Sequence, residues 1–287
     1  MTEKILDFCD PIDSRQFMIA IKKLADDIGY GSDISTFLGS GIEYIQSRAY
    51  EIGDPIKSID WKVTGRTGKF HVKEYEAPKQ MPIYLLIDTS ASMTVSSIKL
   101  SKYHAAVRIA GGIALAALER ISPVGVMGAG GRELFVKPSL SKDRIFQWLL
   151  KLRSYRLDEP TRIGSRLSEL MPILKSRSLL VLISDLHDSS AMPALKLAAQ
   201  KHDCVVIKLT DPAEKEIHNA GFVKVREAES SSVGITKKRN KISDFKFVSE
   251  ELKRSGIDFL ELPTEERISH KLRQFFKFRN LLSRGTR

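Results

Sequence analysis

The chain has 287 residues and 42% of them are apolar, so it can bury a sizeable core in one large domain or two. Its 18 Gly and 11 Pro exclude collagen-like and low-complexity chains, and two cysteines, Cys9 and Cys204, are too few for a disulfide framework or a cysteine-based zinc site. No apolar run reaches the length of a membrane span, and acidic residues stand where a signal peptide needs a basic start. We therefore expect a cytoplasmic protein without a membrane span.

The net charge of +11 is unevenly placed along the chain. Residues 1–82 hold 11 Lys+Arg and 13 Asp+Glu, a net of −2, whereas residues 83–287 hold 35 and 22, a net of +13. A basic domain can attract nucleic acid, a membrane surface or an acidic protein. The basic residues are spread along segments such as Lys99–Lys102 and Lys271–Arg279, with one cluster at Lys237–Lys241, and aromatic residues do not alternate with them as in single-strand binders. We expect an acidic protein ligand and keep nucleic-acid binding as the alternative.

The first 80 residues divide into a helix and a glycine-rich block. Phe17, Ile21 and Leu24 recur at helical spacing and predict a helix over 14–27. Glycines then alternate with short β-prone pieces, 42–45 and 70–75, which predicts hairpins and ordered loops. Few long apolar runs are present there, so we expect residues 1–80 to pack on the remainder of the chain rather than fold alone.

Four residues of the glycine-rich block are candidates for a seam with the main domain or for a partner-binding surface. Trp61 is interpreted as a packing anchor, while Asp54, Asp60 and Arg66 are interpreted as charge-assisted ties across that seam. A catalytic cluster of these three charged residues is the alternative interpretation.

From residue 81 the pattern alternates between strands and helices. Apolar runs at 83–88, 179–185 and 204–209 predict buried strands, and a hairpin is expected around Gly130-Gly131. Further strands are expected near 222–226 and at 257–261; helices are expected over 98–119, after Ser141, and over 163–175, 190–201, 244–254 and 265–282. Such alternation predicts an α/β fold over residues 81–287, a doubly wound, mostly parallel sheet with helices on both faces.

Polar side chains follow two of the predicted strands at the point where each strand ends. Asp88 comes directly after the first strand and is followed by Ser90 and Ser92, while Asp185 follows the strand at 179–184. Open α/β sheets bind ligands at the carboxyl ends of their strands. If the two strands are neighbours, the two carboxylates repel and a divalent cation relieves that repulsion. An all-oxygen set of this kind suits Mg²⁺.

The Asp-x-Ser-x-Ser turn with a second Asp after a later strand resembles the von Willebrand factor A domain. In that family these residues form a metal-ion-dependent adhesion site. The resemblance implies a doubly wound fold and a site made of Asp88, Ser90, Ser92, Thr161 and Asp185. It implies Mg²⁺ as the bound ion, with Mn²⁺ or Ca²⁺ as alternatives.

The glycine-rich block resembles a second family. It reads SRxYxxGDxxxxIDWxxTxR from Ser47 to Arg66 and HVKEY from His71 to Tyr75, which is similar to the bacterial domain of unknown function 58. That family joins such a block to a von Willebrand-like half. The resemblance implies a MoxR-type AAA+ ATPase as the partner, with this protein as its adaptor or cofactor.

An enzyme is the competing class of function. A haloacid-dehalogenase-type phosphohydrolase also starts with Asp after a strand, but it needs a second Asp two residues later, where this chain has Ser90. No Ser-His-Asp set, catalytic carboxylate pair or activated Cys can be assembled from the sequence. We therefore expect a non-enzymatic, metal-dependent protein-interaction module, and we keep a metal-dependent phosphohydrolase as an alternative.

Overall fold

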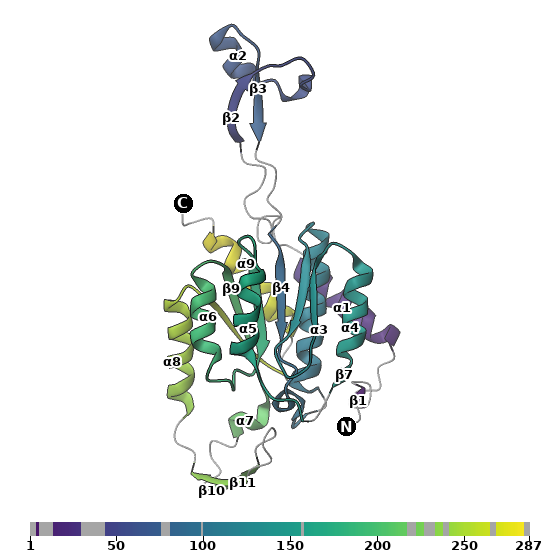
Figure 1. Ribbon diagram of the computed structural model, residues 1–287, viewed down its shortest axis with the longest axis vertical. Coiled ribbons are helices and arrows are strands. Elements are labelled where there is room, and N and C mark those ends of the chain that lie inside the picture. Colours follow the sequence, from purple (N-terminus) through teal and green to yellow (C-terminus); the bar gives the residue numbers. More distant parts are fainter. Residues whose placement is uncertain are drawn as a thin grey trace.

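A computed structural model of the chain places a six-stranded sheet at the centre of the molecule (Figure 1). The structure describes residues 4–5, 14–29, 44–75, 81–98, 100–155, 158–216, 222–226, 233–237, 241–264 and 268–283. Within them, the strand order is β12-β9-β8-β4-β5-β6. The strands are β4 (Ile83–Ile87), β5 (Val124–Gly128), β6 (Phe135–Ser139), β8 (Leu179–Ser184), β9 (Asp203–Thr210) and β12 (Asp258–Pro263). Five strands are parallel and the edge strand β6 is antiparallel to β5.

Helices cover both faces of this sheet because successive residues of each buried strand point to opposite sides. Leu85 and Ile87 belong to one hydrophobic cluster, whereas Leu86 belongs to the other. The first cluster is covered by α1 (Ser14–Gly29), α3 (Lys102–Glu119), α4 (Lys142–Leu152) and α9 (Ile268–Ser283). The second is covered by α5 (Ile163–Leu170), α6 (Ala191–Ala199) and α8 (Lys241–Arg254). The α/β fold with helices on both faces is therefore confirmed.

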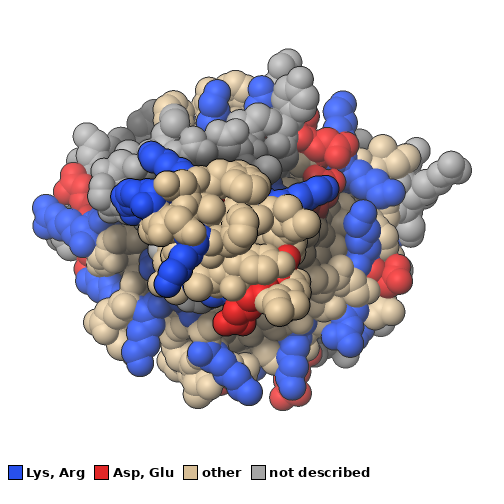
Figure 2. Space-filling view, turned by 90° about the horizontal axis from the view of Figure 1, so that it is seen from above, with Lys and Arg blue, Asp and Glu red and all other residues tan. Residues whose placement is uncertain are grey.

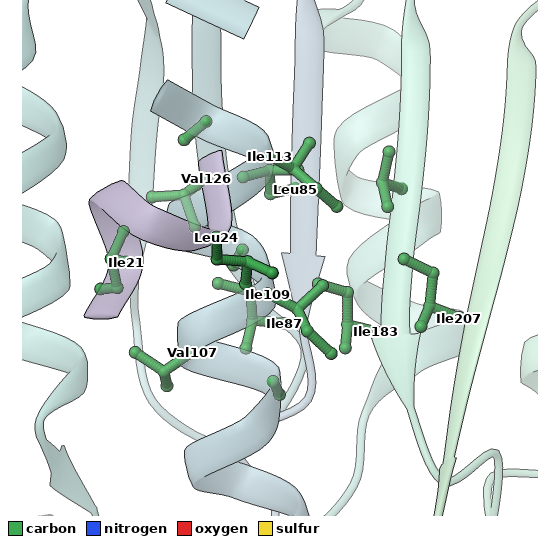
Figure 3. Packing of buried hydrophobic residues seen from close by; sticks show 14 of the residues in the cluster. Ile21, Leu24, Leu85, Ile87, Val107, Ile109, Ile113, Val126, Ile183 and Ile207 are labelled. Carbon is green, nitrogen blue, oxygen red and sulfur yellow. The ribbon is translucent and has the colours of Figure 1, made fainter. Parts of the chain in front are cut away.

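The helix predicted near the N-terminus is part of this core. Figure 3 shows Ile21 and Leu24 of α1 beside the side chains of α3, with Leu85 and Ile87 of the sheet behind them. A Cβ atom built on Gly111 or Gly112 of α3 would come within 2.8 Å of the Ile21 or Leu24 side chain. Glycines at these two positions let α1 cross α3 at close range, so residues 14–29 belong to the α/β domain.

Element boundaries differ from the predicted ones where a side chain decides them. The helix expected from residue 98 begins at Lys102, because the Ser101 hydroxyl accepts a hydrogen bond from the His104 N–H at 3.1 Å and caps it. The helix expected over 163–175 ends at Leu170 and continues as a 3₁₀ turn, η5 (Met171–Ile173), where Pro172 lacks an N–H to donate.

Shorter elements accompany the central sheet and its helices. They are β1 (Lys4–Ile5) paired with β7 (Ser154–Tyr155), β10 (Phe222–Arg226) paired with β11 (Val233–Lys237), η4 (Ala91–Thr94) and α7 (Pro212–Glu216). Cys9, Lys99, Lys238, Arg239 and the predicted boundary at residue 80 lie outside the described residues. Among the described helices, none combines the length and apolar character needed to cross a membrane.

The glycine-rich block forms a small unit of its own elements, β2 (Tyr44–Ala49), η3 (Ile56–Ser58), α2 (Trp61–Thr67) and β3 (His71–Tyr75). The strands β2 and β3 are antiparallel, as expected for a hairpin-like block, but the helix α2 was not predicted. It forms because Asp60 caps it, with the carboxylate accepting from the N–H groups of Lys62 and Val63 at 3.1 and 3.2 Å.

The contacts predicted across a seam between this unit and the sheet are not the ones that the structure shows. Asp54 pairs with Arg48 at 2.7 Å, and Asp60 accepts a hydrogen bond from the Ser47 hydroxyl at 2.7 Å, so both bonds stay inside the unit. Trp61 is 65% exposed, and Arg66 is exposed as well. In Figure 1 the unit stands beyond the end of the sheet where β4 begins. Local capping and pairing therefore satisfy Asp54 and Asp60 inside the unit rather than across a seam with the sheet.

Replacing Trp61 by Ala is therefore expected to change the free energy of unfolding by less than about 1 kcal/mol, as for other exposed positions. The matched control is Trp148→Ala in α4, where the indole is 1% exposed and the expected loss is about 3–5 kcal/mol. Chemical denaturation followed by far-ultraviolet circular dichroism measures both. Equal losses of unfolding free energy in the two variants would instead support a packed seam at Trp61.

Candidate metal centre

The Asp-x-Ser-x-Ser turn lies at the carboxyl end of the central strand β4. Asp88 is fully buried, and its Oδ1 accepts a hydrogen bond from the Ser90 N–H at 3.0 Å. Its Oδ2 accepts a hydrogen bond from the Ser184 hydroxyl at 2.6 Å. Ser184 is the last residue of the neighbouring parallel strand β8. The hydroxyl oxygens of Ser90 and Ser92 lie 3.0 Å apart. The turn therefore gathers one carboxylate and two hydroxyls at the lower end of the sheet in Figure 1, opposite the small unit.

Asp185 follows β8 and brings a second buried carboxylate to the same end of the sheet. Its Oδ2 accepts from the Lys102 Nζ at 2.8 Å and lies 3.0 Å from the His187 Nδ1. Its Oδ1 is buried and has no hydrogen-bond partner in the described part of the chain. A buried carboxylate oxygen without a donor carries the desolvation cost without compensation.

The pKa values of the two carboxylates are shifted in opposite directions. Burial and the charge of Asp185 raise the pKa of Asp88 from 3.8 to about 6. Burial alone would also raise the pKa of Asp185, but the hydrogen bond to His187 and the charge of Lys102 outweigh it and hold that pKa well below its usual range. Asp185 is therefore the carboxylate that stays ionised, and Asp88 is the one that is costly to ionise.

Lys102 is a member of the site that the sequence did not reveal. In the sequence it is one of the basic residues of the segment Lys99–Lys102, but its side chain is 4% exposed and its ammonium contacts Glu214 of α7 at 2.7 Å as well as Asp185. Burial would lower the pKa of Lys102, but the two carboxylates reverse that effect and raise it. One signal was available: Lys102 occupies the first position of α3, where the helix dipole disfavours a cation unless an anion compensates.

The loop that carries Thr161 lies beside the turn, although through different contacts from those expected. The Ala91 N–H donates to the Glu159 carbonyl at 2.8 Å, and Thr161 forms an isolated antiparallel bridge with Gly130. The buried Glu159 carboxylate accepts from the Thr89 hydroxyl and pairs with the Arg132 Nε at 3.0 Å. Glu159 thus holds the turn against the edge hairpin, and the role of Thr161 as a metal ligand stays a prediction.

A third carboxylate, Asp211, lies at the end of β9 but is already satisfied. It accepts from the Ser97 and Ala213 N–H groups, each at 2.9 Å, and from the Ser96 hydroxyl at 3.2 Å. These bonds fasten the segment after the turn to the next strand of the sheet. Asp211 therefore positions the loop, and the sequence contained no signal for it beyond its place after a strand.

The residues present fit a hard divalent cation. In the described residues, no group of three or more His, Cys, Asp or Glu side chains is placed to hold a metal, so two carboxylates, hydroxyls and waters would make up the ligand set. Mg²⁺ tolerates this because it keeps several waters. The unpartnered Oδ1 of Asp185 is an oxygen that such a cation would satisfy. Ser92 is half-buried and gives the site an opening to solvent.

A family model agrees with the resemblance found in the glycine-rich block. The family model described as "Protein of unknown function DUF58" matches residues 46–251. Rv1480 of Mycobacterium tuberculosis H37Rv and Mb1516 of Mycobacterium bovis, both described as uncharacterized proteins, are 26% identical over 224 residues, covering 76% of this chain and 71% of theirs. The crystal structure of the Deinococcus radiodurans RO (RSR) protein is 15% identical with a TM-score of 0.35, covers 94% of this chain, and is spanned by it over about half, 49%, of its own length.

Proposed function

The chain belongs to the DUF58 family, and we propose that it is a non-enzymatic, metal-dependent protein-interaction module. The observation that carries the proposal is the meeting of Asp88 and Asp185 at the ends of adjacent parallel strands, with one oxygen of Asp185 buried and unpartnered in the described structure. Two buried carboxylates beside paired serine hydroxyls form an all-oxygen site that favours Mg²⁺, with Mn²⁺ or Ca²⁺ as substitutes.

In this proposal, Ser90 and Ser92 hold the ion directly, while Asp88, Asp185 and Thr161 hold it directly or through water. The bound ion supplies an electrophilic position that a carboxylate can occupy. Because Ser92 is half-buried whereas Asp88 and Ser90 are fully buried, a partner would reach the ion from the Ser92 side. An Asp or Glu side chain of another protein is the ligand that such a position recognises.

The partner that we propose is a MoxR-type AAA+ ATPase, with this protein as its adaptor or cofactor, as its family resemblance implies. The net charge of +13 over residues 83–287 supports an acidic ligand, because opposite charges speed encounter. Figure 2 views the molecule from the end opposite to the metal centre and shows Lys and Arg side chains spread over this face, with Asp and Glu less numerous among them. On this face the basic side chains do not form a single stripe of the kind that would favour nucleic acid.

Metal binding is tested first, on the full chain. Mg²⁺ or Mn²⁺ at saturating concentration is expected to raise the melting temperature above that in chelator, because a ligand that binds only the native state stabilises it. Ser90→Ala and Asp185→Asn are expected to lose most of this rise. Ser168→Ala, on the exposed side of α5, is the matched control and should keep it. Identical melting curves with metal and with chelator in the unmodified protein contradict the proposal.

The partner is tested with the MoxR-type ATPase encoded in the same genome. Complex formation is expected to need the metal and Ser92, and to be abolished by chelator. DNA or RNA binding that ignores chelator and falls steeply with salt would instead favour the nucleic-acid alternative. Turnover of a phosphate ester that requires Asp88 and metal would favour the phosphohydrolase.

A further inference from the structure

The candidate metal centre already contains a cation that belongs to the chain. The Lys102 ammonium lies 2.8 Å from the Asp185 Oδ2 and 2.7 Å from a carboxylate oxygen of Glu214. Its side chain is 4% exposed and that of Asp185 is fully buried, so water screens this pair little. The positive charge that a buried Asp185 requires is therefore supplied from α3 in the structure described.

In this arrangement the two carboxylate oxygens of Asp185 differ in their contacts. One of its oxygens carries Lys102 and His187, whereas the other has no hydrogen-bond partner among the described residues. A divalent cation held by Asp185 would lie within a few ångströms of the ammonium, because both would share one carboxylate. Two positive charges at that distance in a buried site repel strongly, so metal and ammonium compete for the same counter-charge.

Glu214 offers the ammonium a second place to go. Its side chain is 34% exposed and projects from α7, a short helix that follows β9 at the same end of the sheet. A lysine side chain is long and flexible enough to keep its contact with Glu214 while leaving Asp185. The pair Lys102–Glu214 then lies nearer to solvent than Asp185 does.

We infer that Lys102 is the resting counter-ion of the metal centre and that a divalent cation displaces its ammonium from Asp185 toward Glu214 and solvent. The inference rests on the proposed function, because it assumes that the centre binds metal. It adds a consequence: the metal-bound state presents an ammonium beside α7 that the metal-free state buries. A partner that carries a carboxylate can therefore distinguish the two states of the site at two positions rather than one.

The first test is Mn²⁺ affinity measured by electron paramagnetic resonance on the full chain. Lys102→Met is expected to bind Mn²⁺ at least about tenfold more tightly than the unmodified protein, because the competing charge is gone. Lys196→Met is the matched control: it removes the same charge from a half-exposed pair with Glu251 on the other face of the sheet and should leave the affinity unchanged. Equal or weaker Mn²⁺ binding by Lys102→Met overturns the inference.

The second test uses the unmodified protein, so it decides the matter even if Lys102→Met does not fold. Lysines are acylated briefly with acetic anhydride and read by mass spectrometry, with and without saturating Mn²⁺. Modification of Lys102 is expected to rise at least about fivefold with Mn²⁺, because the amine leaves a site in which it is 4% exposed, while Lys196 stays constant. Bound Mn²⁺ with Lys102 still protected overturns the displacement alone. Absence of Mn²⁺ binding in every variant overturns the proposed function as well.

Discussion

Lys102→Met is expected to lower the free energy of unfolding by about 3–5 kcal/mol in the absence of metal, the usual cost of removing one partner of a buried ion pair. The loss is large because Asp185 is fully buried and, among the described residues, is left with the exposed His187 as its ion-pair partner. Its second oxygen has no hydrogen-bond partner among the described residues, so nothing there compensates for the lost ammonium. Urea unfolding at pH 7.5 in chelator measures the change.

Two variants separate a charge effect from a packing effect. Lys102→Met combined with Asp185→Asn is expected to recover most of the loss, because no uncompensated charge is then buried. Lys196→Met breaks a pair with Glu251 whose side chains are 41% and 30% exposed, so its cost should stay below about 1 kcal/mol. If Lys102→Met costs no more than Lys196→Met, the ammonium does not stabilise Asp185.

Asp88→Asn is expected to stabilise the metal-free protein at pH 7.5, by about 2–3 kcal/mol. Burial and the charge of Asp185 raise the pKa of Asp88 from 3.8 to about 6, so the folded state disfavours its ionised form. An Asn at this position keeps an oxygen that accepts from the Ser90 N–H, and its NH₂ group can donate to the Ser184 hydroxyl oxygen, without the charge. Such a gain on removing a side chain marks a site that is kept for function at the expense of stability.

The pH dependence of the stability difference follows from the raised pKa of Asp88. For a group whose pKa is raised on folding, the contribution to stability is complete below 3.8 and is lost as the pH rises through about 6. The two proteins should therefore be about equally stable near pH 3.8, and the advantage of Asp88→Asn should open between there and pH 6 and stay constant above. Saturating Mg²⁺ should narrow or reverse it, because Asp88→Asn removes a carboxylate of the proposed metal centre and the ion would stabilise the unmodified protein more. An advantage that is independent of pH contradicts the electrostatic explanation.

Most of the fold followed from the sequence because its signals are local. The apolar runs of β4, β8 and β9 are buried on both faces. Such runs are typical of parallel strands in a sheet that helices cover on each side. Phe17, Ile21 and Leu24 showed α1 by their spacing. The helix α2 was not predicted because its glycine-rich surroundings favour turns, and a single capping carboxylate, Asp60, decides where it begins.

The exposure of Trp61 could not be predicted from composition either. A large aromatic residue is usually buried, but the small unit closes its own hydrogen bonds and ion pairs through Arg48, Asp54 and Asp60. These contacts lie within the unit, and Trp61 is 65% exposed on it.

By itself, the sequence determined that Asp88 and Asp185 follow buried strands, with Ser90 and Ser92 beside the first. Those positions depend only on the order of residues and on the alternation of strands and helices. Only the tertiary structure decided which charges from distant elements meet there: Lys102 from α3 contacts Asp185 and Glu214 from α7 over separations of 83 and 112 residues. Ion pairing acts through space and leaves no periodic trace along a chain, so the counter-charge of Asp185 became visible only when strands, helices and loops were assembled at one end of the sheet.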